Sequence, residues 1–216
     1  AAAVQAACRR FGLSEPQQGR HRLFIPCGRS VAACQDLSTG EFLSYSYSTS
    51  GTTDYHVALS GNLLFHGRVT YDTSGKKSLA PGTHRPVLTG DTAYFGRPES
   101  VAAIDLENPR EIETKDRRGR PVKQTELPER WRMSYSLVHD MPQGVEPEQW
   151  LAANPMQIHI KAGNRLYGHQ ARTVFAVDLS QGADGEPTVS WKADIDGRVA
   201  SMLAADGRLF VVTEEG

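Results

Sequence analysis

The sequence has few cysteines, no long apolar run and almost no net charge, and each of these absences excludes a class of protein. Three cysteines in 216 residues are an odd number and too few for a disulfide framework. No stretch approaches the ~18 consecutive apolar residues of a transmembrane helix. The 24 Lys plus Arg residues nearly balance 25 Asp plus Glu residues, whereas a nucleic-acid binder usually carries a basic excess. We therefore expect neither a nucleic-acid partner nor a transmembrane segment.

The composition that remains is that of a globular, turn-rich chain. Hydrophobic residues make up 39% of the sequence and the formal net charge is -1. A disordered chain has fewer hydrophobic residues and a larger net charge. The length is sufficient to bury a sizeable core. The chain contains 20 Gly and 12 Pro residues with few long helical patterns, which indicates many turns.

Two short segments near the N-terminus are ambiguous. Residues 1–19 are alanine-rich at the start and place Arg9-Arg10 after the apolar part, the reverse of a signal peptide. We expect a tail or a short helix there. Cys27 and Cys34 flank a possible hairpin turn, but a bridge between strands has strict geometric requirements. We favour free, partly buried thiols, and whether the two are bridged stays open.

One pattern recurs along the chain: a small-residue turn, a short apolar and aromatic strand, and a second strand that ends in Asp. Complete copies cover 22–40, 61–76, 90–106 and 163–179, and a fifth begins at Asp206. Aromatic and β-branched residues fit a pleated surface, and pairs such as Gly90-Asp91 tolerate the positive φ of tight turns. The pattern predicts an all-β chain of short antiparallel strands. The repeated aspartates are expected to have a structural role in turns: Asp36, Asp72, Asp105 and Asp178.

The spacing of the copies agrees with four-stranded units. Four short strands with their turns need about 40 residues, the period of a propeller blade. The longest gap contains two segments, 107–130 and 139–155, which we interpret as insertion loops on one blade. An aromatic residue also follows each Asp turn on the next strand, at Tyr45, Trp131 and Trp191. Because the position repeats, we expect Trp131 and Trp191 to pack.

The passages 33–41, 176–179 and 191–211 resemble the repeat of pyrroloquinoline-quinone-like (quinoprotein-like) β-propellers, and look most like uncharacterised bacterial members of that family. The resemblance covers residues 20–216 and implies an all-β propeller of four-stranded antiparallel blades. Family members have seven or eight blades, so the four to five repeats here imply part of a larger propeller. Alternatively, the strand at 21–26 closes the ring against the last blade. The resemblance also favours an extracytoplasmic location, periplasmic or secreted.

The same resemblance implies an enzymatic alternative. Quinoprotein dehydrogenases hold pyrroloquinoline quinone (PQQ) and Ca²⁺ with a catalytic Asp, a Trp floor and often a vicinal cysteine pair. This chain has no adjacent cysteines, and its aspartates and tryptophans repeat as structural positions. We therefore predict no catalytic residue and no cofactor. PQQ and Ca²⁺ would belong only to a fragment of such a dehydrogenase. A third interpretation is an accessory propeller fused to a separate catalytic domain.

Other catalytic and metal-binding motifs are absent from the sequence. The seven histidines show no HxxxH or HExxH spacing, and His159 is expected to be a hydrogen-bonded strand residue. No Gly-x-Ser-x-Gly elbow, P-loop or Rossmann fingerprint occurs.

Arginine recurs between the two strands of the repeat. On a propeller these residues would cluster near one rim and bind anions or an acidic protein, although a polar turn is the simpler interpretation. The residues are Arg29, Arg68, Arg97 and Arg172. The basic run at 115–120 is expected to be a solvated loop because acidic residues dilute it. Together these features predict a non-catalytic binding or scaffold module that engages a protein partner or small ligand through rim loops.

Overall fold

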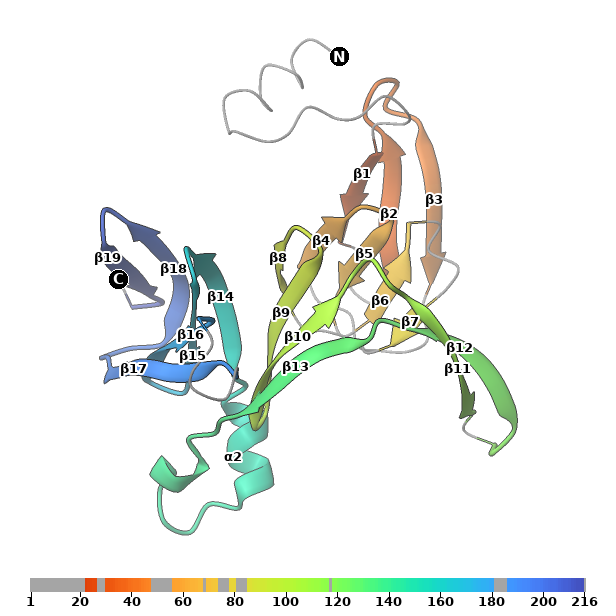
Figure 1. Cartoon of the computed structure of the whole chain (residues 1–216). Helices are drawn as coiled ribbons and strands as arrows, with labels where there is room; N and C mark the ends of the chain where they lie inside the picture. The colour runs from red at the N-terminus through yellow and green to blue at the C-terminus, as the bar shows by residue number, and fades with distance from the viewer. Residues whose placement is uncertain are drawn as a thin grey trace. The chain divides into compact units, whose positions relative to one another are not determined.

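The structure is a computed structural model that describes residues 22–26, 30–47, 56–67, 69–73, 78–80, 85–116, 118–180 and 186–215. The predicted N-terminal tail, 1–19, lies outside these residues. The chain separates into two compact units, residues 1–78 and 79–216, and each is described by itself. Strands dominate both, so the predicted all-β class is confirmed (Figure 1). No helix in the described part is long and apolar enough to cross a membrane.

The first unit contains two small antiparallel meanders. One sheet has the order β1-β2-β3, with strands β1 (Arg22–Ile25), β2 (Ser30–Asp36) and β3 (Phe42–Tyr47). The other pairs β4 (Val57–Ser60), β5 (Leu63–His66) and β6 (Val69–Asp72) in sequence order. Their shared core consists of Val31, Ala32, Leu64 and Tyr71. The first two copies of the sequence repeat thus form antiparallel strand pairs, β1–β2 and β5–β6.

The described part of the second unit contains two four-stranded antiparallel sheets and two hairpins, one of which, β11–β12, is described below (Figure 1). The first sheet is β8 (Val87–Thr89), β9 (Thr92–Arg97), β10 (Ser100–Asp105) and β13 (Glu129–Ser134). The second is β14 (Gln157–Ala162), β15 (Arg165–Gln170), β16 (Thr173–Asp178) and β17 (Thr188–Asp194). The other hairpin is β18 (Val199–Ala205) and β19 (Arg208–Thr213). The four-stranded antiparallel order expected of a blade therefore occurs twice here.

The two segments expected as insertion loops contain regular structure. Residues 107–130 hold the hairpin of β11 (Arg110–Lys115) and β12 (Pro121–Glu126), followed by the start of β13. Strand β12 runs parallel to β7 (Ser78–Ala80), with Thr125 opposite Leu79. Residues 139–155 include the end of the 3₁₀ turn η1 (Val138–Asp140) and helix α2 (Pro147–Ala153). Pro147 fits the first helical position, where its missing N–H has no intrahelical partner.

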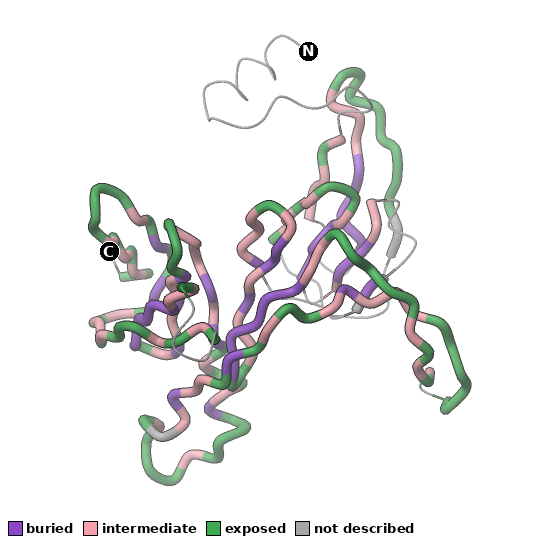
Figure 2. Tube along the Cα trace, in the orientation of Figure 1, coloured by how far each residue is buried: buried purple, intermediate pink, exposed green. Residues whose placement is uncertain are grey.

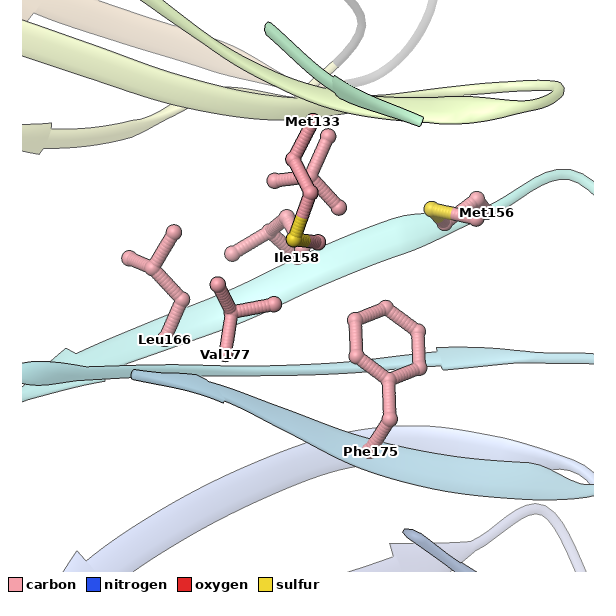
Figure 3. Packing of buried hydrophobic residues seen from close by; sticks show 7 residues of the cluster. Met133, Met156, Ile158, Leu166, Phe175 and Val177 are labelled. Atoms are coloured by element: carbon pink, nitrogen blue, oxygen red, sulfur yellow. The ribbon is translucent and has the colours of Figure 1, made fainter. Parts of the chain in front are cut away.

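The middle sheet of the second unit is buried on both faces. One face packs against the sheet formed by β8, β9, β10 and β13 (Figure 3). The buried residues of this contact are Val101, Met133, Met156, Ile158, Leu166, Phe175 and Val177. The other packs against the β18–β19 hairpin through Val174, Val199 and Met202. Buried residues concentrate in β10 and β16, whereas the β11–β12 hairpin is mostly exposed (Figure 2). This stack of repeated sheets agrees with propeller blades, but a closed propeller is not seen among the described residues and stays a prediction.

The turns explain why the strands stop where they do. Asp206 and Gly207 both have positive φ, 50° and 71°, the conformation of the two-residue hairpin turn that joins β18 to β19. Gly163, with φ of 56°, makes the equivalent turn between β14 and β15. Strand β14 therefore ends at Ala162 and strand β18 at Ala205, directly before these turns.

Candidate functional site

The repeated aspartates lie at strand ends and bond to the backbone that follows. Asp36 Oδ1 accepts hydrogen bonds from the Ser38 and Thr39 N–H groups at 2.8 and 3.0 Å. Asp105 likewise accepts from the N–H of Glu107, and Asp178 from that of Ser180, both at 2.8 Å. Asp72 also lies at a strand end, that of β6.

These hydrogen bonds explain why the pKa of a turn aspartate is low. A side-chain hydrogen bond from Asn108, with the Glu107 N–H, holds the pKa of Asp105 below its usual value. Hydrogen bonds to an ionised carboxylate stabilise the charged form. The aspartates therefore act as ionised turn residues within the fold.

Of the four predicted rim arginines, the structure describes Arg97 and Arg172. Arg29 and Arg68 lie outside the described residues. Arg97 forms an ion pair with Glu129 at 3.3 Å, and its guanidinium lies 5.2 Å from the centre of the Phe95 ring. Arg172 pairs with Asp196. Arg172 also lines a cavity, and Arg97 is not among the residues that line it.

That cavity, called the rim cavity below, is the main candidate site. It is open and has a volume of about 980 Å³. Its lining comes from the connections at one end of the second unit: Arg85 before β8, residues of 153–157 between α2 and β14, the 171–172 turn, the 196–198 loop, and the end of β19. Binding sites are commonly carried by such connections, because a rigid scaffold positions them.

One wall of the rim cavity, residues 196–215, carries all three carboxylates of the lining. Asp196 pairs with Arg172, and Glu214 lies 3.3 Å from Arg198. Glu215 accepts a hydrogen bond of 2.9 Å from the Arg198 N–H. That bond is the largest cause of the lowered pKa of Glu215. The charges of this wall therefore compensate one another locally.

Outside residues 196–215 the lining carries no acidic residue. Its polar side chains there are Arg85, Asn154, Gln157, His169 and Arg172. Each can donate an N–H in an appropriate amide orientation or tautomer, and the Asn154 amide already donates to the Trp150 carbonyl at 2.9 Å. This part of the lining is called the donor wall below.

A buried glutamine fixes the donor wall to the rest of the unit. Gln170 has no exposed surface. Its Oε1 accepts from the Leu137 N–H at 2.9 Å, and its Nε2 donates to the Pro98 carbonyl at 3.0 Å and to the Asn154 carbonyl at 3.4 Å. The side chain thus ties the 135–154 connection to the β9–β10 turn. Buried polar groups with satisfied hydrogen bonds impose one specific arrangement.

His169 of the lining forms a hydrogen-bonded pair with His159 of the neighbouring strand. His159 Nε2 and His169 Nδ1 are 2.8 Å apart. His159 sits at a bulge in β14, where the register with β15 shifts between Ile158 and Ile160. A bulge turns a side chain away from its regular strand position, and here it brings the two rings together. The expectation that His159 is hydrogen-bonded agrees with this contact.

Burial keeps both imidazoles neutral near pH 7. Desolvation lowers the pKa of His159 and of His169 to about 4. For His159, the neighbouring His169 and the positive charge of Arg85 contribute in the same direction. Among the residues described, no group of three or more His, Cys, Asp or Glu side chains is arranged to hold a metal ion.

Two other predicted features do not line the rim cavity. Cys34 on β2 is a free, buried thiol whose pKa is raised by burial, whereas Cys27 lies outside the described residues.

Trp131 on β13 and Trp191 on β17 each lie opposite an alanine of a central strand, Ala103 and Ala176. Trp131 packs against the buried cluster, as expected, whereas Trp191 is 47% exposed.

Sequence reasoning identified Arg172 but missed Arg85, Asn154, Gln157, His169 and Arg198. These residues belong to separate connections and strands, and no spacing in the sequence joins them. Comparison with known proteins adds no further assignment. No protein-family model matches the chain, and no curated protein matches it.

Proposed function

We propose that this chain is a non-catalytic binding module of the quinoprotein-like β-propeller type, and that its ligand or partner binds in the rim cavity. The repeated four-stranded sheets of the second unit, each packed face to face with the next, support the propeller part of the proposal. The observation that carries the binding part is the cavity itself, because four separate connections, together with residues of β15 and β19, build its walls.

The form of the cavity suits recognition of a polar ligand. Its volume of about 980 Å³ lies at the upper end of the ~300–1,000 Å³ typical of ligand sites. Its polar groups are held by specific contacts, the Gln170 bonds on one side and the Arg172–Asp196 pair on the other. Preorganised groups of this kind reduce the ordering that binding requires.

Two adjacent alanines of helix α2 provide a matched test. Ala153 is exposed and lines the cavity, whereas Ala152 is exposed on the same helix and does not line it. A random peptide library displayed on phage is selected against the immobilised chain. Selected peptides should bind the native chain and Ala152→Trp equally but lose at least about tenfold in affinity on Ala153→Trp. Circular dichroism checks that both variants fold.

The contrary result is equally specific. Peptides that bind Ala153→Trp as tightly as the native chain would place the binding surface elsewhere and overturn the proposal. Failure of the native chain to select any peptide would also count against a peptide-binding rim.

A further inference from the structure

We propose that the free edge of β19 accepts an extended segment of a partner protein as an added antiparallel strand, with an aspartate of that segment opposite Arg208. The inference goes beyond the proposed function because it concerns a second binding surface. The groove beside this edge shares no lining residue with the rim cavity.

Strand β19 is paired along one edge in the described part of the chain. Its partner there is β18, and these two strands form a sheet of their own. In the two four-stranded sheets, the strands that hold the same place, β9 and β15, also pair with a third strand, β10 or β16. An edge without this partner presents backbone N–H and C=O groups to which another strand can add.

The complete copies of the repeat show how the next strand is aligned. The aspartate that ends it lies opposite the first residue of the strand before it. The pairs are Arg22–Asp36, Leu63–Asp72, Thr92–Asp105 and Arg165–Asp178. In the last pair, Arg165 Nε and Asp178 Oδ2 are 3.7 Å apart. Because Arg208 is the first residue of β19, the same alignment places a carboxylate of the added strand opposite its guanidinium.

A backbone hydrogen bond accompanies this alignment. The residue after the aspartate donates its N–H to the carbonyl of the residue before the preceding strand. The bond runs from Leu106 to Asp91 at 2.8 Å and from Leu179 to Asn164 at 2.9 Å. Gly207 immediately precedes β19, so its carbonyl is the equivalent acceptor for an added strand.

The groove beside β19 provides an apolar surface for the side chains of the added strand. It has a volume of about 480 Å³, and Leu209 of β19 and Trp191 of β17 both line it. Trp191 is 47% exposed, whereas Trp131 packs in the interface between the two four-stranded sheets. The sheet that covers Trp131 has four strands, whereas the hairpin on the Trp191 side has two. A third strand beside β19 therefore adds the cover that Trp191 lacks. The charged lining residues are Arg165, Asp206 and Arg208.

The same alignment predicts the sequence of the segment. The residue before the aspartate is Ile104 in β10 and Val177 in β16, and Val177 lies opposite Leu166. Leu209 holds the place of Leu166 in β19, so a β-branched apolar side chain of the segment lies beside it in the groove. Strands β10 and β16, with the leucine after each, share the pattern Ser/Thr-Val-x-Ala-Ile/Val-Asp-Leu. A segment of this pattern is therefore the occupant that the edge fits.

The probe is an acetylated Ser-Val-Ala-Ala-Ile-Asp-Leu peptide with a Gly-Ser linker and a C-terminal fluorescein, and its control has the same residues in scrambled order. Fluorescence anisotropy with the full chain measures both affinities. We expect saturable binding of the probe and at least about tenfold weaker binding of the scrambled peptide, because alternate side chains determine specificity in strand addition.

Methylation of peptide nitrogens distinguishes strand addition from other modes of binding. In β10 the N–H of Leu106 points to the β9 side, at the Asp91 carbonyl, whereas that of Asp105 donates to the Pro128 carbonyl before β13. These directions alternate along a strand. N-methylation at the Ile and Leu of the probe should therefore weaken binding at least about tenfold, whereas N-methylation at the second Ala and the Asp should change it less than about threefold. Equal effects of the two modified peptides would contradict strand pairing.

Charge reversal tests the alignment. Arg208→Glu should weaken binding of the probe about three- to tenfold, and a probe with Lys in place of Asp should recover most of that loss on this variant. Arg110→Glu is the matched control, because Arg110 is also the exposed first residue of a strand, β11, in another hairpin. It should leave the affinity unchanged. Circular dichroism checks that both variants fold.

The remaining outcomes separate this inference from the proposed function. Binding of the probe that persists on Ala153→Trp supports a surface distinct from the rim cavity. Loss of binding on Ala153→Trp, with no effect of Arg208→Glu, would place the probe in the rim cavity and overturn the inference while supporting the proposed function. Self-association of the chain that the probe reverses in sedimentation velocity would assign the edge to a second copy and overturn the partner segment. Equal binding of the scrambled peptide would also overturn it.

Discussion

Tyr94 and Trp131 lie on either side of Ala103, with their ring centres 6.0 Å apart. The two aromatic residues come from the strands that flank β10, so the small alanine leaves space for their contact. Both rings pack against the core between the two four-stranded sheets. The next sheet repeats the arrangement, with Tyr167 and Trp191 opposite Ala176.

The two tryptophans should therefore differ in their effect on stability. Trp131 packs against the buried cluster, whereas 47% of Trp191 is exposed. Trp131→Ala should lower the free energy of unfolding by about 2–4 kcal/mol because it removes a large packed ring. Trp191→Ala should lower it by less than about 1 kcal/mol. Urea unfolding followed by circular dichroism measures both. Equal losses would contradict the packing assigned to Trp131.

Two glycines without positive φ should resist substitution because other backbone approaches them closely. A Cβ atom at Gly96 would lie 2.3 Å from the Met156 carbonyl oxygen, and one at Gly168 would lie 2.5 Å from that of Gln157. Either contact forces the start of β14 to move. Gly96→Ala and Gly168→Ala should each lower the free energy of unfolding by about 1–3 kcal/mol.

Gly119 provides the comparison for this prediction. It has φ of 76° and open space around its Cα, so Gly119→Ala adds backbone strain of about 1 kcal/mol without a clash. Denaturant midpoints of the three variants test the difference. A larger loss at Gly119 than at Gly96 and Gly168 would show that the close approaches are wrong.

Much of the strand order in the second unit was predictable because it depends on local residues. Turn pairs such as Asp206-Gly207 and apolar runs such as 173–177 indicate where strands turn and which residues face a core. The division into two units was not predicted, because the repeats alone suggested one propeller. Nor was the β11–β12 hairpin, because its highly charged sequence resembles a solvated loop.

Cys34 should be unreactive in the folded chain. The thiol is buried, with 2% of the residue exposed, and burial raises its pKa. Since the thiolate is the reactive form, both effects slow modification. In a Cys8→Ser, Cys27→Ser background, the disulfide reagent DTNB should react at least about 100-fold more slowly with the folded chain than with the urea-unfolded chain. Immediate reaction of the folded chain would contradict the burial of β2.

The histidine pair predicts how stability depends on pH. In the folded chain the pKa of each ring is about 4, below the value of ~6.5 for an unfolded histidine. Between these values the unfolded chain binds more protons, so the pair's contribution to stability is present above about pH 6.5 and is lost as pH falls toward 4. The urea midpoint should therefore be lower at about pH 5 than at about pH 7.

The double variant His159→Gln, His169→Gln tests the assignment of this effect. Its midpoint should change less between the same two pH values, because the paired imidazoles that resist protonation are absent. If the double variant shows the full pH dependence of the native chain, other groups are responsible.

The rim cavity was less predictable than the strands, and the histidine pair shows why. Regular pairing across the Gly163-Asn164 turn places His159 opposite Gly168, not beside His169. Only the bulge at His159 brings the rings together, and nothing in the sequence marks that bulge. Arg172 was recognised from its place in the repeat, but its neighbours in the cavity come from connections that the repeat does not constrain.

The most direct test of the account is an amide-resolved NMR titration of the full chain with a peptide selected from the phage library. The account predicts saturable shifts at Ala153, Asn154, Gln157 and Arg172, which line the rim cavity. Shifts confined to the β11–β12 hairpin, with the rim cavity unchanged, would contradict it.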